Sequence, residues 1–314
     1  MELWMRLGQP LEDVIADHER VLDAWQAGGV RGLVIGRMVF MPTLGAGIEA
    51  EGIPAFEPDG RVYRSLDVEP PARPRERFPE KRAQLERLLD GAKRRGWVVL
   101  IFEPAAFRGP GGDGSVLLDD LARRAYAARA QDTLAAFPQV DGAIIDGPEW
   151  PYELASDAAS LGAYARLRGR AGDIFEPIAP AGRAVAARLG YDFDALVAAQ
   201  GRLRERLHRL DDATVAAQAT GGLLGGLAML GYDAGVVDWL RFRIDALLDF
   251  VLALRDRLDR SGRRYRLGMG PRTASFAPLA GYDLARLAER LDYLLPKHYF
   301  WHRGYDGMYG SWAR

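Results

Sequence analysis

The sequence contains no cysteine and only four histidines among its 314 residues. The absence of cysteine excludes disulfides, thiolate metal sites and a cysteine nucleophile. No His-x-His or His-Glu-x-x-His spacing occurs, and no dinucleotide-binding fingerprint follows the first apolar run. We therefore expect neither a cofactor nor a histidine-bound metal, while an ion held by carboxylate oxygens stays open.

The sequence also lacks an excess of charge of one sign and any long apolar run. Its formal net charge is −1 at pH 7, so it offers no basic surface for nucleic acid. No stretch approaches the roughly 18 apolar residues of a membrane span, and residues 1–6 do not begin a signal peptide. We expect a cytoplasmic protein without a nucleic-acid or membrane partner; its oligomeric state stays open.

What the sequence does contain is an alternation of strand-like and helix-like segments. Short apolar runs bounded by glycine or proline are typical of strands that are buried on both faces of a parallel sheet. We predict strands at residues 2–7, 30–40, 97–102, 140–145, 265–271 and 292–300. Helical periodicity is present at residues 10–25, 78–95, 116–136 and 282–291. This order predicts a parallel sheet covered by helices.

Two segments interrupt the alternation. Residues 154–260 show only helical periodicity, and we predict helices at 193–210, 211–230 and 234–260 in a subdomain over the end of the fourth strand. Within it, residues 220–226 have the composition of a membrane-active segment but are too short to span a bilayer, so we interpret their glycines and leucines as close helix packing. Residues 41–77 are rich in glycine and proline and are predicted to form a functional loop or lid.

Six predicted strands are two fewer than the eight that close the usual α/β barrel. An open sheet would need only six. The sequence ends in what reads as another βα loop, however, so we expect a (β/α)8 TIM-type barrel that is incomplete at its C-terminus. In this interpretation residues 1–153 form the first half of the barrel, residues 154–260 the helical insertion, and residues 261–314 strands five and six.

The strongest functional signal follows the fourth predicted strand. Asp146 ends the apolar run, Gly147 and Pro148 stop the strand, and Glu149 and Trp150 come directly after. Catalytic groups of parallel α/β barrels gather at the carboxyl ends of the strands. Two carboxylates beside an aromatic ring predict a sugar-hydrolysing site. The alternative is an ordinary loop whose acidic residues cap the next helix.

The same stretch resembles a known signature. Residues 141–149 look like the fourth-strand motif of glycoside hydrolase TIM barrels and are similar to the chitinase-type Asp-Gly-x-Asp-x-Asp-x-Glu. Ile144 replaces the middle aspartate, and Glu149 comes one residue late. The order of motifs over about residues 2–310 resembles uncharacterised bacterial glycoside-hydrolase-like barrels, which carry Trp-x-x-x-Arg (here 239–243) and Asp-Tyr-x-x-Pro-x-x-Tyr-x-Trp (here 292–301). The resemblance implies a barrel that hydrolyses a carbohydrate.

Glycosidic cleavage needs a proton donor for the leaving oxygen and a second carboxylate. We predict Glu149 as the general acid/base, because Trp150 would supply an apolar wall that favours the neutral acid. Asp146 would be the second carboxylate. Glu103, at the end of the third predicted strand, competes with Asp146 for this role.

The remaining candidates would bind the substrate. Trp150 and Trp301 offer flat faces for a sugar ring, and Lys297 and His298 would form hydrogen bonds with its hydroxyls. Arginines near strand ends favour an acidic or heavily hydroxylated substrate. The full set of predicted substrate-binding residues is Lys297, His298, Tyr299, Trp301, Trp150, Glu103, Arg37 and Arg272. Core packing for His298 and Tyr299, and structural ion pairs for the arginines, are the alternatives.

Two other functions fit the same residues. A lyase or aldolase would use Lys297 as a Schiff-base or proton-transferring amine at a strand end. A non-catalytic carbohydrate-binding barrel would keep the aromatic rings without a working pair of carboxylates. The sequence favours the glycoside hydrolase because the carboxylates and the order of the motifs agree.

Overall fold

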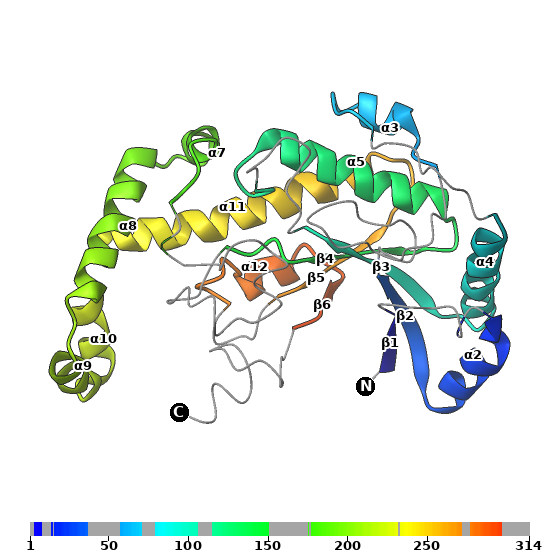
Figure 1. Cartoon of the computed structure of the whole chain (residues 1–314), viewed down its shortest axis with the longest axis horizontal. Helices are drawn as coiled ribbons and strands as arrows, with labels where there is room; N and C mark the ends of the chain where they lie inside the picture. The colour runs from blue at the N-terminus through cyan, green and yellow to red at the C-terminus, as the bar shows by residue number, and fades with distance from the viewer. Residues whose placement is uncertain are drawn as a thin grey trace.

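A parallel β-sheet lies at the centre of the molecule. The structure is a computed structural model that describes residues 3–7, 14, 16–36, 57–70, 79–105, 115–150, 175, 177–231, 233–271 and 277–296. Its strands are β1 (Leu3–Leu7), β2 (Val30–Gly36), β3 (Val98–Pro104), β4 (Gly142–Asp146), β5 (Arg266–Gly270) and β6 (Tyr293–Leu294). They follow one another in chain order, and each neighbouring pair is parallel (Figure 1). The predicted parallel α/β sheet is confirmed.

The sheet is curled into a half-barrel. The rings of Trp4 on β1 and Tyr293 on β6 are in edge-to-face contact, with centroids 5.2 Å apart. In a flat sheet, five inter-strand spacings of about 4.8 Å would separate these two strands by about 24 Å, which is more than two side chains can bridge. The first and last strands therefore curve toward each other around a concave face, as in an α/β barrel.

Large side chains fill this concave face, and glycines make room for them. Val34, Leu100 and Ile144 are buried there, and Trp4, Val98, Phe102, Tyr293 and Leu295 pack around them. A Cβ atom on Gly32 would lie 2.6 Å from the Trp4 ring, and one on Gly268 would lie 2.5 Å from Cδ1 of Ile144. Glycine at these two positions therefore allows the bulky residues of neighbouring strands to lie across the sheet.

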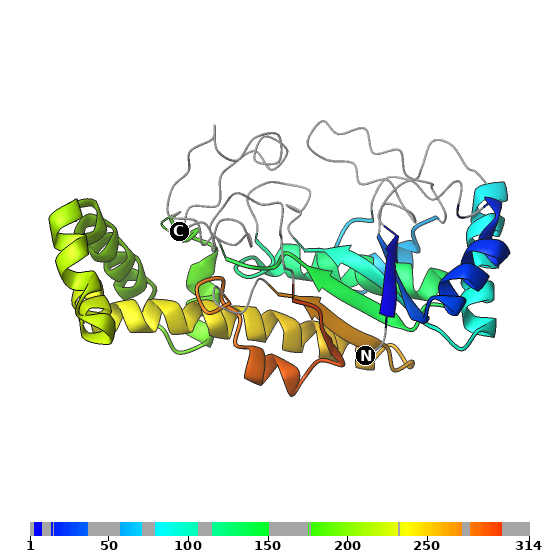
Figure 2. The same ribbon diagram turned by 90° about the horizontal axis from the view of Figure 1, so that it is seen from below.

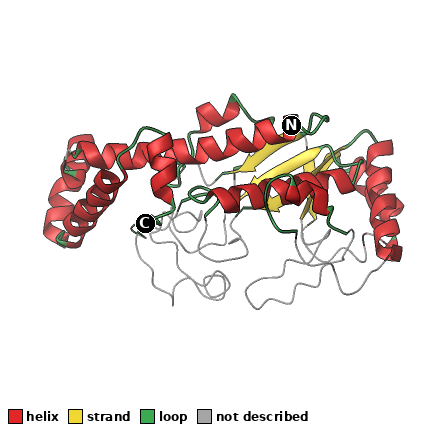
Figure 3. Ribbon diagram, turned by 90° about the horizontal axis from the view of Figure 1, so that it is seen from above, coloured by secondary structure: helices red, strands yellow, loops and turns green. Residues whose placement is uncertain are grey.

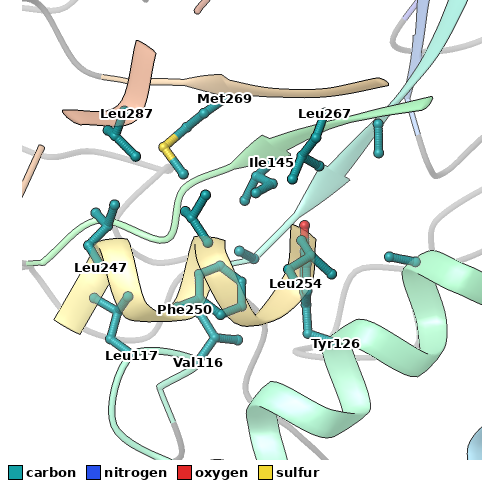
Figure 4. Close-up of a cluster of buried hydrophobic side chains, with 14 of the residues drawn as sticks. Val116, Leu117, Tyr126, Ile145, Leu247, Phe250, Leu254, Leu267, Met269 and Leu287 are labelled. Carbon is teal, nitrogen blue, oxygen red and sulfur yellow. The ribbon is translucent and has the colours of Figure 1, made fainter. Parts of the chain in front are cut away.

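Helices cover the convex face. They are α2 (His18–Ala27), α4 (Pro79–Arg94), α5 (Asp120–Ala136), α11 (Ala234–Asp259) and α12 (Leu284–Ala288). Because successive strand residues point to opposite faces, Ile145 packs toward the helices while Ile144 points into the concave side. Figure 4 shows Ile145, Leu267 and Met269 of the sheet against Leu247, Phe250 and Leu254 of α11. This cluster is the main hydrophobic core.

The segment after β4 is helical in its described part, as predicted. It contains α7 (Gly182–Arg188), α8 (Phe193–His208), α9 (Asp212–Ala219) and α10 (Gly222–Leu230). Helix α11 runs from this arm back onto the sheet (Figures 1 and 2). The single helix predicted over residues 211–230 is two helices instead, because Gly222 adopts a φ of +56° and the chain turns back there. Only glycine occupies that conformation at low cost.

The predicted long loop over residues 41–77 contains regular structure. Its described part, residues 57–70, includes α3 (Gly60–Arg64), which begins at an Asp59 side chain that accepts a hydrogen bond from the Arg61 backbone. Tyr63 and Val68 are buried against Ala128 of α5, and the Asp59 amide donates to Asp132 of the same helix. This part of the connection is therefore fixed on the outer side of α5 (Figure 1). Figure 3 shows the strands in yellow flanked by red helices.

None of the helices that the structure describes combines the length and the apolar composition needed to cross a membrane.

The predicted sixth strand, residues 292–300, is described only as far as residue 296 and contains β6.

We expect Gly142→Ala to lower the free energy of unfolding by about 3 kcal/mol, at the upper end of overpacking costs. Its Cβ would lie 1.8 Å from the carbonyl oxygen of Arg266, which belongs to the backbone of β5 and cannot turn away. Urea unfolding followed by circular dichroism measures the change. Gly201→Ala in α8 is the control, since no atom lies within 4 Å of its Cβ and alanine favours a helix by about 1 kcal/mol. Equal stabilities for the two variants would contradict the packing described for β4 and β5.

Tyr191→Phe should change the stability of the protein at alkaline pH. Burial, together with the hydrogen bond from Tyr191 to Asp245 at 2.6 Å, raises the pKa of Tyr191 to about 12. The folded chain then holds a proton that the unfolded chain releases near pH 10. This stabilisation is complete below pH 10 and is lost as the pH rises through 12. We expect the variant to be less stable below pH 10 and to show a flatter decline between pH 10 and 12 in urea titrations. An unchanged slope would count against this hydrogen bond.

Candidate functional site

The carboxyl ends of the strands share one edge of the sheet, and Asp146 lies there on the concave side. It is the last residue of β4 and follows Ile144 of the concave cluster by two positions, so its side chain belongs to the same face. Its carbonyl oxygen accepts a hydrogen bond of 2.6 Å from the amide of Ala105, just beyond β3. The side chain of Asp146 is half-buried. The backbone thus holds this residue firmly at the strand end.

Glu149 is held at the same edge by a tyrosine. Gly147 has a φ of +70°, a conformation that favours glycine, and it ends β4 with a sharp change of direction. The hydroxyl of Tyr282 then donates a hydrogen bond of 2.7 Å to Oε2 of Glu149. Tyr282 is buried in the core, which fixes its ring and orients the carboxyl group. Asp146 and Glu149 therefore both lie at the carboxyl edge of β4.

The sequence predicts that Trp150 offers an exposed ring face to a sugar, but the structure buries this ring. It is only 6% exposed, and its ring packs against Phe242 of α11 with centroids 5.8 Å apart. Its indole nitrogen donates to the carbonyl oxygen of Arg243 at 2.8 Å, and its amide donates to the carbonyl oxygen of Ala280 at 3.1 Å. A buried indole needs a partner for its N–H, and α11 supplies one. Trp150 therefore anchors the loop after β4 and does not offer a face to a sugar.

A buried arginine completes this anchor. Arg243 is 1% exposed, and its guanidinium carbon lies 5.4 Å and 4.8 Å from the ring centroids of Trp150 and Trp239. Burial lowers the pKa of Arg243 to about 9, so the side chain is still a cation at neutral pH. Aromatic faces offset part of the cost of removing such a cation from water. Its Nη2 atom donates to the carbonyl oxygen of Leu279 at 2.6 Å, which joins α11 to the turn before Tyr282.

Glu103 lies on the opposite face of the sheet from Asp146. It is fully buried, and its neighbour Phe102 belongs to the concave side, so Glu103 faces the helices. There its Oε2 lies 3.4 Å from Nε of Arg129 on α5. Tyr126 of the same helix donates to the Glu103 carbonyl oxygen at 3.2 Å. The structure does not bring Glu103 together with Asp146. Glu103 instead contacts Arg129 and Tyr126 and ties β3 to α5.

The other predicted substrate-binding residues, namely Arg37, Arg272, Lys297, His298, Tyr299 and Trp301, lie outside the described residues. Within the described ranges, no three histidine, aspartate or glutamate side chains gather closely enough to hold a metal ion.

Sequence reasoning missed a cation on the concave face. The guanidinium carbon of Arg6 on β1 lies 4.3 Å from the centroid of the Phe102 ring. Arg6 is exposed and forms no hydrogen bond or ion pair with any residue in the described part of the chain. Phe102 is paired with Ile144, so Asp146 lies two residues, or about 7 Å, further along the strand direction. The alternation of Trp4 and Arg6 in the first strand was the signal that could have revealed this position.

A hollow of about 570 Å³ lies at the opposite edge of the sheet. It lies before β5 and β6 and is lined by Arg255, Asp259, Gly262, Arg264 and residues 289–292. Arg255 already forms ion pairs with Asp259 and with Asp292. Chemistry in parallel α/β barrels takes place at the carboxyl ends of the strands, whereas the amino-terminal face serves stability. We therefore place the candidate site at Asp146 and Glu149, and not in this hollow.

Comparisons with protein-family models, with curated proteins and with solved structures gave no match to this chain. The likeness to glycoside hydrolases therefore rests on the sequence motifs alone.

We expect Arg243→Ala to lower the free energy of unfolding by about 3 kcal/mol, because it leaves a cavity beside two tryptophans and removes the hydrogen bond to Leu279. Arg241→Ala is the control on the same helix. Arg241 is exposed and lies 3.8 Å from Asp238, so its loss should change stability by less than about 0.5 kcal/mol. Chemical denaturation of both variants measures the difference, and a small effect at position 243 would show that the anchor is dispensable.

Proposed function

We propose that this protein hydrolyses glycosidic bonds at the carboxyl edge of β4, with Glu149 as the general acid/base and Asp146 as the second carboxylate. The observation that carries the proposal is the presence of two carboxylates at one strand end, one on the concave face and one oriented by the Tyr282 hydroxyl at 2.7 Å. In the proposed reaction Glu149 gives its proton to the leaving oxygen. Asp146 then attacks the anomeric carbon, or activates a water molecule that does so.

The rigid surroundings of Glu149 support this role. A proton donor must be held within hydrogen-bond reach of the atom that it protonates. The contacts of Trp150 with α11 and with Ala280 limit the movement of the loop that carries Glu149. Tyr282 fixes the carboxyl group itself. Preorganisation of this kind is what a general acid requires.

Arg6 supports a polar substrate in the proposed site. Its guanidinium lies on the Phe102 ring, on the same face as Asp146 and toward the same edge. Arginine provides several N–H donors in a fixed plane, which suits sugar hydroxyls or a sugar carboxylate. The proposal includes the (β/α)8 form of the barrel, in which further strand ends would contribute to the same site.

Glu149→Gln tests the general acid directly. On unsubstituted phenyl glycosides, whose leaving group is poor, we expect turnover to fall by about 10²–10⁴-fold, because the leaving oxygen then lacks its proton donor. On dinitrophenyl glycosides, which need little protonation, the loss should be much smaller. Asp146→Asn should abolish turnover of both substrates. Glu289→Gln, an exposed carboxylate near the amino-terminal edge, is the matched control and should retain wild-type rates.

Unchanged turnover of both substrates by Glu149→Gln would remove the assignment of the general acid. Binding of oligosaccharides by the wild-type protein without turnover of any glycoside would favour the carbohydrate-binding barrel. Borohydride trapping of a carbonyl substrate on the protein would favour the lyase or aldolase.

A further inference from the structure

The hairpin of α9 and α10 exposes apolar side chains that nothing in the described part of the chain covers. Leu223 is 80% exposed and Leu224 is 68% exposed, and Val215 and Leu227 are also exposed. Leucine is normally among the most buried residues, and clustered exposed leucines mark surfaces that bind something. Figures 1 and 2 place this hairpin at the far end of the arm formed by α8 and α11, away from the sheet.

Close helix packing, which the sequence predicts for these residues, accounts for Gly225 but not for the two leucines. A Cβ atom on Gly225 would lie 1.7 Å from the carbonyl oxygen of Gln218, so the two helices touch at this point. Gly226 has no atom within 4 Å of its Cβ position, and Leu223 and Leu224 remain exposed. The glycines therefore bring the helices together, while the leucines are left on the outside.

The exposed leucines lie at the tip of the hairpin. At its base, the end of α10 contacts α8, where Arg206 donates to the carbonyl oxygen of Ala228 at 3.3 Å. The turn at residues 220–221 joins α9 to α10 at the opposite end, and Leu223 and Leu224 follow it directly. The tip is therefore the part of the hairpin that projects farthest from α8.

The hairpin also forms an uncharged cap. Residues 213–232 include no charged side chain, and the nearest ones, Asp211, Asp212 and Asp233, stand where the hairpin joins α8 and α11. Helix α10 has nine residues and is about 13 Å long. Interfacial helices insert their apolar side about 5–10 Å into the boundary between headgroups and acyl chains. The tip can therefore enter that boundary while the charged base stays in water.

The size of the apolar surface argues against a second copy as its partner. A stable protein interface takes about 800 Å² from each partner. Even an aromatic side chain buries only about 150–250 Å², and the whole hairpin offers four partly exposed aliphatic side chains. A lipid surface needs no matching partner area. The charges at the base are mixed, with Arg204, Arg206 and Arg209 beside Glu205 and Asp211, so the contact does not depend on anionic lipid.

We propose that the α9–α10 hairpin docks the protein on a lipid bilayer surface by inserting Leu223 and Leu224. The protein then lies on the membrane and does not cross it. The proposal goes beyond the sequence-based expectation of no membrane partner, which rested on the absence of a spanning segment, because it concerns contact with the bilayer surface alone. This inference does not depend on the proposed hydrolase activity.

Vesicle flotation and a fluorescent label test the proposal. The full chain should float with phosphatidylcholine vesicles, and added phosphatidylserine or salt should change this little. Leu223→Asp combined with Leu224→Asp should reduce the floated fraction at least tenfold. Leu121→Asp, at an exposed leucine on α5, is the matched control and should float like the wild type. Unchanged circular dichroism verifies that the variants are folded.

Because the chain has no cysteine, a single Leu224→Cys can carry an environment-sensitive dye without side reactions. Vesicles should shift its emission to the blue, whereas the same dye at Val237→Cys, on α11, should not respond. Absence of flotation together with an unshifted dye at position 224 would overturn the proposal. The proposal would also be overturned if the protein formed a concentration-dependent dimer that Leu223→Asp abolishes, and if this dimer did not float with vesicles.

Discussion

The curl of the sheet depends on how its concave face is packed. Trp4 and Tyr293 meet from the two outermost strands, and the glycines at 32 and 268 leave the space that their neighbours occupy. A Cβ atom at either glycine would collide with the Trp4 ring or with Ile144, so glycine at both positions permits this packing. The curl turns Asp146 toward the same concave space as the Arg6 side chain on the first strand. Packing deep inside the half-barrel therefore determines which side chains share its carboxyl edge.

Helix α11 connects the two parts of the molecule for which we propose a role. One part of it packs on β4 and β5 and holds Trp150 through Phe242 and Arg243. Its beginning lies against α8, in the arm that carries the α9–α10 hairpin. Burying an arginine without partners costs free energy. For Arg243, contacts with two indole rings and a hydrogen bond to a carbonyl oxygen offset part of this cost. The same helix thus stabilises the loop of Glu149 and supports a surface far from it.

Charge is distributed differently in these two parts. The carboxyl edge gathers Asp146, Glu149 and Arg6, whereas the tip of the hairpin has no charge at all. A protein of net charge −1 can therefore present a polar concave face for a small hydroxylated ligand and an apolar tip for a lipid surface. The two proposals concern separate surfaces, and each stands on its own observations.

Local signals in the sequence, namely apolar periodicity and glycine or proline stops, are enough to predict the parallel α/β sheet, the helical segment after β4 and the place where Asp146 and Glu149 follow a strand. The direction in which the side chains point depends on contacts that form only in the folded protein. Trp150 is buried by Phe242 and Arg243, which lie more than ninety residues away along the chain, and Glu103 turns toward α5. The break between α9 and α10 depends on the backbone conformation of Gly222. Leu223 is exposed because no other described part of the chain packs against it. Contacts between distant residues set these outcomes, and no local pattern encodes them.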